Sequence, residues 1–147
     1  MQLLNIAASF TSSKHDFRRI LEQSAVVWHS SLTAKNRRAL ERVQKCAVRV
    51  ILKGKYSNYE DGLKMLRIDN LDIRRKELCL RFAKNCLKNE KVKTMFEKNP
   101  SKHSMKKRKT KKFKICRAKT KRYQKSSIPY MVGLLNDDNE KQRLMMN

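Results

Sequence analysis

The chain has 147 residues, and its 37 lysine and arginine side chains outnumber its 13 aspartate and glutamate side chains, which gives a formal net charge of +24. Charged residues make up 34% of the chain, above the roughly 25% of an ordinary soluble domain. This length fits one domain, or a small domain with a tail, and the excess of positive charge disfavours an enzyme that acts alone on a neutral substrate.

No run of about 18 apolar residues is present to cross a membrane, and the first ten residues are too short and too polar for a secretion signal. We therefore expect an intracellular protein with no membrane partner and no small-molecule substrate. The four cysteines, at 46, 79, 86 and 116, have neither close spacing nor a secretory context, which favours reduced thiols over disulfides. Because histidines and cysteines do not cluster, we expect no metal and no cofactor.

Helical spacing of apolar residues begins near His15 and predicts a first helix that runs to about Trp28. A polar break follows, in which Thr33 is the best N-cap candidate for the clearest helix of the chain. That helix is expected to end at Gly54 and to bury one apolar stripe. The stripe consists of Leu40, Val43, Ala47, Val50 and Ile51.

Two further helices are predicted between Gly54 and Asn89. The first is short, with the apolar residues Tyr59, Leu63 and Leu66 and with Ser57 or Asn58 as its cap. The apolar face of the second comprises Leu78, Cys79, Phe82, Ala83, Cys86 and Leu87. Residues 92–96 add a last turn before Pro100. Residues 15–97 are therefore expected to form a small all-α bundle of about four helices.

A basic tail is predicted over residues 98–125, which hold 14 basic residues and no acidic residue. Phe113 and Ile115 are isolated apolar residues there and too few to offset chain entropy, so this tail is expected to be disordered when free. Residues 126–147 are expected to form a short apolar docking segment and a polar, solvated C-terminus. Residues 1–14 have no clear pattern.

The basic tail is the feature of the sequence that most clearly indicates a binding partner. A flexible segment with many cations releases condensed counterions on meeting nucleic acid, which gives affinity for RNA or DNA with little sequence discrimination. The candidate phosphate-binding residues are Lys106, Lys107, Arg108, Lys109, Lys111, Lys112, Lys114, Arg117, Lys119, Lys121 and Arg122. Phe113 and Tyr123 are candidates for stacking on single-stranded bases. Because Lys106–Lys112 also fits a nuclear-import signal, the nucleus is the expected location, with the cytoplasm as the alternative.

Two features invite a catalytic interpretation, and both are weak. Asp137 and Asp138 are adjacent, but no returning strand follows them, so a solvated tail is favoured over half of a two-metal site. His29 precedes two serines, but the chain has only three glycines and no Gly-x-Ser-x-Gly elbow, so a polar helix end is favoured over a nucleophile. We therefore expect no catalytic residue.

Several runs of residues match a known family. They are ILEQSAVVWHSSLT at 20–33, LERVQK at 40–45, RVIL at 49–52, RRKELCLRFAK at 74–84, TKRY at 120–123, SIPY at 127–130 and LLN at 134–136. In these runs, which span roughly residues 7 to 136 with their surroundings, the sequence resembles the C-terminal region of reverse transcriptases from non-long-terminal-repeat (jockey-like, LINE-type) retrotransposons. One departure is that residues 13–19 lead straight into Ile20, as if several residues were deleted.

The resemblance implies a helical, thumb-like element that follows the catalytic palm and helps to hold template and primer through their phosphates. The family's endonuclease, fingers and palm, with its paired aspartates, would lie before Met1, so none of the family's catalytic residues has a counterpart here. The chain is therefore expected to be a truncated fragment that is inactive alone, with RNA or DNA and a reverse-transcriptase palm as its candidate partners.

Two other interpretations stay open. The charge alone fits an independent nuclear RNA- or DNA-binding protein of ribosomal or chromatin type, which would form a stable assembly with a particular nucleic acid at physiological salt. The missing palm fits a relic open reading frame without function, whose product would show no cooperative thermal transition.

Overall fold

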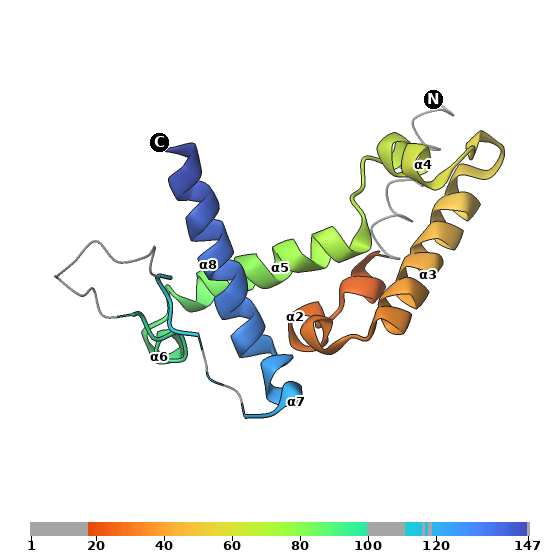
Figure 1. The fold of residues 1–147 in the computed structure, drawn as a ribbon. Coiled ribbons are helices and arrows are strands. Elements are labelled where there is room, and N and C mark those ends of the chain that lie inside the picture. Colours follow the sequence, from red (N-terminus) through yellow and green to blue (C-terminus); the bar gives the residue numbers. More distant parts are fainter. Residues whose placement is uncertain (1–17, 100–110, 116, 118, 147) are drawn as a thin grey trace. The chain divides into compact units, whose positions relative to one another are not determined.

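The structure, a computed structural model, describes residues 18–99, 111–115, 117 and 119–146. Seven α-helices lie within these residues (Figure 1), and their only β-type pairing is an isolated antiparallel bridge between Lys98 and Phe113. The predicted all-α class is therefore confirmed, although the described residues contain more helices than the four expected.

Most of the helices are short. They are α2 (Ala25–Trp28), α3 (Ala34–Leu52), α4 (Tyr59–Leu66), α5 (Leu71–Cys86), α6 (Glu90–Lys93), α7 (Lys121–Gln124) and α8 (Ser127–Met145), with the 3-10 turns η1 (His29–Ser31) and η2 (Lys53–Lys55). Residues 18–22 form a further helical turn before α2.

The helix starts follow local sequence signals. Thr33 Oγ1 accepts a hydrogen bond from the backbone N–H three residues on (3.2 Å), and Asn58 Oδ1 does the same (2.8 Å), so both predicted N-caps are confirmed. The end of α3 differs from the prediction. Lys53, with a φ of 48°, follows the last helical residue and donates its N–H to the carbonyl of Arg49, whereas Gly54 lies inside η2.

The described residues divide into two compact units. Unit 1 contains residues 18–25 and Leu32–Lys76, and unit 2 contains Val26–Ser31 and the described part of Glu77–Asn147. The residues of the expected bundle, 15–97, are thus divided between the two units where the structure describes them. The reason lies in α5, because residues of its second half share a core with residues of α8.

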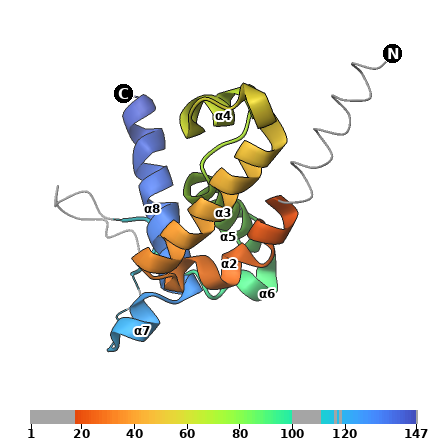
Figure 2. The ribbon, with the colours of Figure 1, turned by 90° about the vertical axis from the view of Figure 1, so that its right-hand side faces the viewer.

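Unit 1 is built on α3 and α4, which lie side by side in Figure 2. Val48 and Leu52 of α3 form its buried cluster together with Leu66 and Ile68. These four apolar residues, with the partly buried side chains around them, are the core of this unit.

The predicted apolar stripe of α3 is only partly correct. Leu40, Ala47 and Ile51 are half-buried and Ile51 packs against the core, but Val43 and Val50 are exposed and Gln44 is fully buried. The physical reason is a long-range hydrogen bond, because Gln44 Nε2 donates to the backbone carbonyl of Asp69 (3.0 Å) and turns this side of the helix inward.

Two helical glycines offer a matched test of this packing. A Cβ at Gly62 of α4 would lie 2.7 Å from Val48 Cγ1 and 3.2 Å from Leu52 Cδ1, whereas a Cβ at Gly133 of α8 would meet nothing within 4 Å. Overpacking costs about 1–3 kcal/mol and alanine in a helix gains about 0.5–1 kcal/mol over glycine. We expect Gly62→Ala to lower the free energy of unfolding by about 1 kcal/mol and Gly133→Ala to raise it by about 0.5–1 kcal/mol. Urea unfolding measures both, and effects of the same sign would contradict the packing.

The C-terminal part of unit 2 differs from the sequence prediction. A short docking segment followed by a solvated C-terminus was expected, but both belong to one helix, α8, which is 19 residues long. Pro129 is tolerated because it lies in the first turn, where its missing N–H breaks no helical hydrogen bond. Met131, Val132 and Leu135 of α8 pack in one cluster with Ala83 of α5, which is the crossing of the two helices seen in Figure 1.

Candidate nucleic-acid interface

Phe113 anchors the basic segment in unit 2. Its side chain is 2% exposed and lies in a cluster with Phe96, Ala83 and Val132. Asn136 of α8 holds the backbone of the same residue, because its Oδ1 accepts the Phe113 N–H (2.9 Å) and its Nδ2 donates to the Phe113 carbonyl (3.1 Å). The expectation that Phe113 is isolated and available to stack on bases is therefore wrong.

The backbone around Phe113 is also held on its other side. The Lys114 N–H donates to the carbonyl of Glu97 (2.8 Å), and the Asn99 N–H donates to the carbonyl of Lys112 (3.0 Å), which completes the antiparallel bridge. Asn99 Nδ2 adds a hydrogen bond to the carbonyl of Lys111 (2.6 Å). Residues 111–114 are thus pinned along their length.

Three lysines, which we call the lysine triplet, project from this pinned segment: Lys111, Lys112 and Lys114. All three are exposed. Successive side chains of an extended backbone point to opposite faces, so the inward position of Phe113 turns its two lysine neighbours outward. Lys114 pairs with Glu97 (2.9 Å), and Lys112 donates to Asn139 (3.4 Å). Because exposed ion pairs are weak, Glu97 leaves most of the positive charge of the triplet available.

The other predicted phosphate-binding residues divide into two groups. Arg117, Lys119, Lys121 and Arg122 are exposed, and the last two lie in the first turn of α7 after its N-cap, Thr120. Lys106, Lys107, Arg108 and Lys109 lie outside the described residues. Tyr123, the second stacking candidate, is 46% exposed. The structure therefore keeps Tyr123, but not Phe113, accessible to a base.

A groove of about 800 Å³ lies beside the lysine triplet. It is lined by Met95, Glu97, Asn99, Lys111, Lys114, Ile115 and Arg117. Three of these residues are predicted phosphate-binding cations, and Met95 and Ile115 add exposed apolar side chains. The groove can therefore receive a phosphate next to an apolar surface. Sequence reasoning missed Met95, Glu97 and Asn99, because only the bridge across a long stretch of chain brings them here.

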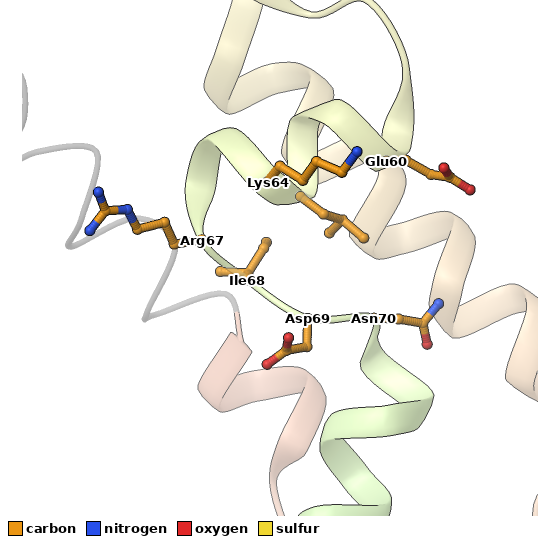
Figure 3. A pocket seen from close by; sticks show the side chains of 7 residues that line it. Glu60, Lys64, Arg67, Ile68, Asp69 and Asn70 are labelled. Carbon is orange, nitrogen blue, oxygen red and sulfur yellow. The ribbon is translucent and has the colours of Figure 1, made fainter.

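A smaller hollow of about 420 Å³ lies at the end of α4 in unit 1 (Figure 3). It is lined by Glu60, Leu63, Lys64, Arg67, Ile68, Asp69 and Asn70. Its two carboxylates balance its two cations, and Figure 3 shows Lys64 and Arg67 extending in different directions. This hollow therefore lacks the concentrated positive charge that a phosphate site requires.

The histidine and serines that invited a catalytic interpretation close a helix end. His29 is fully buried in η1, where its Nε2 lies within hydrogen-bond distance of Tyr130 Oη (3.2 Å) and the two rings meet edge to face. Ser31 Oγ donates to the carbonyl of Trp28 (2.9 Å), the last residue of α2, and so satisfies a carbonyl at the end of that helix. The predicted polar helix end is what the geometry shows.

The adjacent aspartates lie within a helix, where Asp137 is exposed to solvent and Asp138 is partly buried. Both belong to α8, and Asp138 forms an ion pair with Lys84 of α5 (2.8 Å). Asp138 also accepts a hydrogen bond from Gln142 (3.2 Å). The expected solvated tail is therefore wrong at this position, because the carboxylate of Asp138 joins α8 to α5.

Three of the cysteines lie within the described residues and form no disulfide there: Cys46 is exposed, and Cys79 and Cys86 are buried. Burial raises the pKa of the Cys86 thiol. Across the part of the chain that the structure describes, no group of three or more metal-ligating side chains gathers, and no helix is both long and apolar enough to span a membrane. Cys116 lies outside the described residues.

Comparison of the chain with protein-family models, with curated proteins and with solved structures finds no match.

Proposed function

We propose that this protein binds RNA or DNA through the phosphates, with the lysine triplet at the centre of the contact. The observation that carries the proposal is the anchoring of Phe113, which holds three exposed lysines on one pinned backbone segment beside a groove. A segment that is ordered before binding loses less conformational entropy in the complex than a free tail does. Cation contacts to phosphates carry no sequence information, so the binding is blind to sequence.

The fragment hypothesis extends this proposal. The runs at 20–33 and 40–45 support an origin in the C-terminal region of a non-long-terminal-repeat retrotransposon reverse transcriptase, and the positive charge fits a role in holding template and primer. On this proposal the chain has no polymerase activity of its own and acts in the nucleus, where Lys106–Lys112 would direct it. DNA synthesis by the purified chain on a primed RNA template would contradict it.

The binding proposal is tested by a triple variant, Lys111→Gln, Lys112→Gln and Lys114→Gln, measured with a labelled DNA duplex of mixed sequence. Each phosphate contact contributes about 0.9 to the slope of log affinity against log salt. We therefore expect the slope to fall by about 2 to 3, with unchanged helix content in circular dichroism. The matched control neutralises three other exposed lysines of unit 2, Lys88, Lys91 and Lys141, and should change the slope by less than about 1. A triple variant that keeps the wild-type slope would overturn the central role of the triplet.

A further inference from the structure

Helix α3 of unit 1 carries a second concentration of positive charge. Arg38, Arg42, Lys45 and Arg49 are all exposed and follow one another at steps of four, three and four residues. These steps place the four side chains on one side of an α-helix. We call these four residues the α3 stripe.

The α3 stripe is kept apart from the core. The buried residues of α3, Gln44, Val48 and Leu52, also repeat at helical spacing, but about a quarter to a third of a turn around the helix from the stripe. The packing of these residues in unit 1 therefore fixes which side of the helix the four cations occupy.

No carboxylate neutralises the α3 stripe within the described residues, where none of its four cations forms an ion pair. The only acidic residue of α3 is Glu41, which is engaged elsewhere. Its carboxylate accepts hydrogen bonds from Tyr59 and from Asn70 (2.8 Å). Burial and the hydrogen bond to Glu41 raise the pKa of Tyr59 well above its usual range, so this phenol stays a donor.

The dimensions of the α3 stripe suit a nucleic-acid backbone. A helix rises 1.5 Å per residue, so the eleven steps from Arg38 to Arg49 extend over roughly 16 Å. Double-stranded DNA carries one negative charge per about 1.7 Å of its axis, so several phosphates lie within reach of a straight row of this length. The helix diameter, about 10–12 Å, also matches the width of the major groove, about 12 Å.

The residue types of α3 favour a nucleic-acid duplex over a single strand or a membrane surface as the anionic partner. Single strands are held by aromatic side chains that stack on bases, and α3 contains no aromatic residue. A helix that lies on a membrane buries a face rich in Trp, Phe or Leu among the lipids, whereas Leu52 of α3 belongs to the core of unit 1 and the exposed Val43 and Val50 are small. We infer that the α3 stripe is a second nucleic-acid-binding surface, which contacts the phosphate backbone of a duplex independently of the lysine triplet.

The test uses the full chain and a quadruple variant, Arg38→Gln, Arg42→Gln, Lys45→Gln and Arg49→Gln. Glutamine has a helix propensity close to those of arginine and lysine, so α3 should persist. With a 20-base-pair DNA duplex, the slope of log affinity against log salt should fall by about 3 to 4. Equivalently, the wild-type protein should lose about 100-fold more affinity than the variant between 50 and 200 mM salt.

The matched control has the same change of charge and the same residue types at exposed positions on other elements: Arg67→Gln, Arg81→Gln, Lys141→Gln and Arg143→Gln. It should lower the slope by less than about 1. An equal loss in both variants would show that net charge alone matters and would overturn the inference. If the quadruple variant loses helix content, the pairs Arg38→Gln with Arg42→Gln and Lys45→Gln with Arg49→Gln take its place, and each should lower the slope by about half as much.

Two more arms separate this inference from its rivals. A quadruple variant that keeps its duplex affinity but no longer binds vesicles of anionic phospholipid would overturn the inference in favour of a membrane surface. A wild-type duplex slope in the quadruple variant, together with a reduced slope in the lysine-triplet variant, would overturn the inference and leave the proposed function standing. The reverse pattern would support the α3 stripe and overturn the role of the triplet.

Discussion

Replacing Phe113 with alanine is expected to lower the free energy of unfolding of unit 2 by about 3 to 5 kcal/mol. The ring is 2% exposed and contacts the cluster that joins α5 and α8, so its loss leaves a cavity that Phe96 and Met131 close only in part. The same change removes the side-chain anchor of the lysine triplet and leaves only the backbone hydrogen bonds to hold this segment, without altering the net charge. We therefore expect affinity for a DNA duplex to fall several-fold as well, since the segment must then be ordered on binding. Chemical denaturation and a binding titration at fixed salt measure the two effects.

Phe82 provides the control for this substitution. It was expected to be buried from its place in the helical pattern, but it is 47% exposed on α5. Phe82→Ala should therefore cost less than about 1 kcal/mol and leave the duplex affinity unchanged. Similar costs for the two phenylalanines would show that Phe113 is not the anchor of the basic segment.

Features that depend on neighbours in the chain were predictable from the sequence. The all-α class follows from apolar residues at helical spacing, and the caps at Thr33 and Asn58 follow from side chains that bond an N–H three residues on. The exposure of Lys111, Lys112 and Lys114 could be expected in the same way, because lysine is seldom buried.

Features that depend on distant partners were not predictable. Gln44 of α3 is buried because its side chain bonds the carbonyl of Asp69, so a pattern of apolar residues alone does not predict its burial or the exposure of Val43 and Val50. The anchoring of Phe113 requires Asn136, which lies 23 residues away and holds the backbone at both its N–H and its carbonyl. The composition of the basic tail gives only its overall charge. The burial of Phe113 and its two hydrogen bonds with Asn136 hold the neighbouring lysines on an ordered segment, which composition cannot show.

Replacing Arg75 with methionine is expected to lower the free energy of unfolding of unit 1 by about 1 to 3 kcal/mol. The Arg75 side chain is fully buried, and burial lowers its pKa, while the carboxylates of Asp72, Glu41 and Glu22 favour its charged form. Methionine fills similar space but removes the charge that these three carboxylates favour. Asp72 keeps its ion pair with Lys76, and Glu41 keeps its hydrogen bonds from Tyr59 and Asn70, so the expected cost is the partial loss of electrostatic compensation around a buried position.

Two further variants, at Lys76 and at Arg75 itself, test whether the cost of losing Arg75 is electrostatic. Lys76 also pairs with Asp72 (2.7 Å), but its side chain is about half exposed, so Lys76→Met should cost less than about 1 kcal/mol. Arg75→Lys keeps the positive charge, so this variant should recover part of the stability that Arg75→Met loses. Urea unfolding of the three variants and the wild type measures the differences. Equal losses in Arg75→Lys and Arg75→Met would instead assign the role of Arg75 to its packing, because these two variants differ in charge.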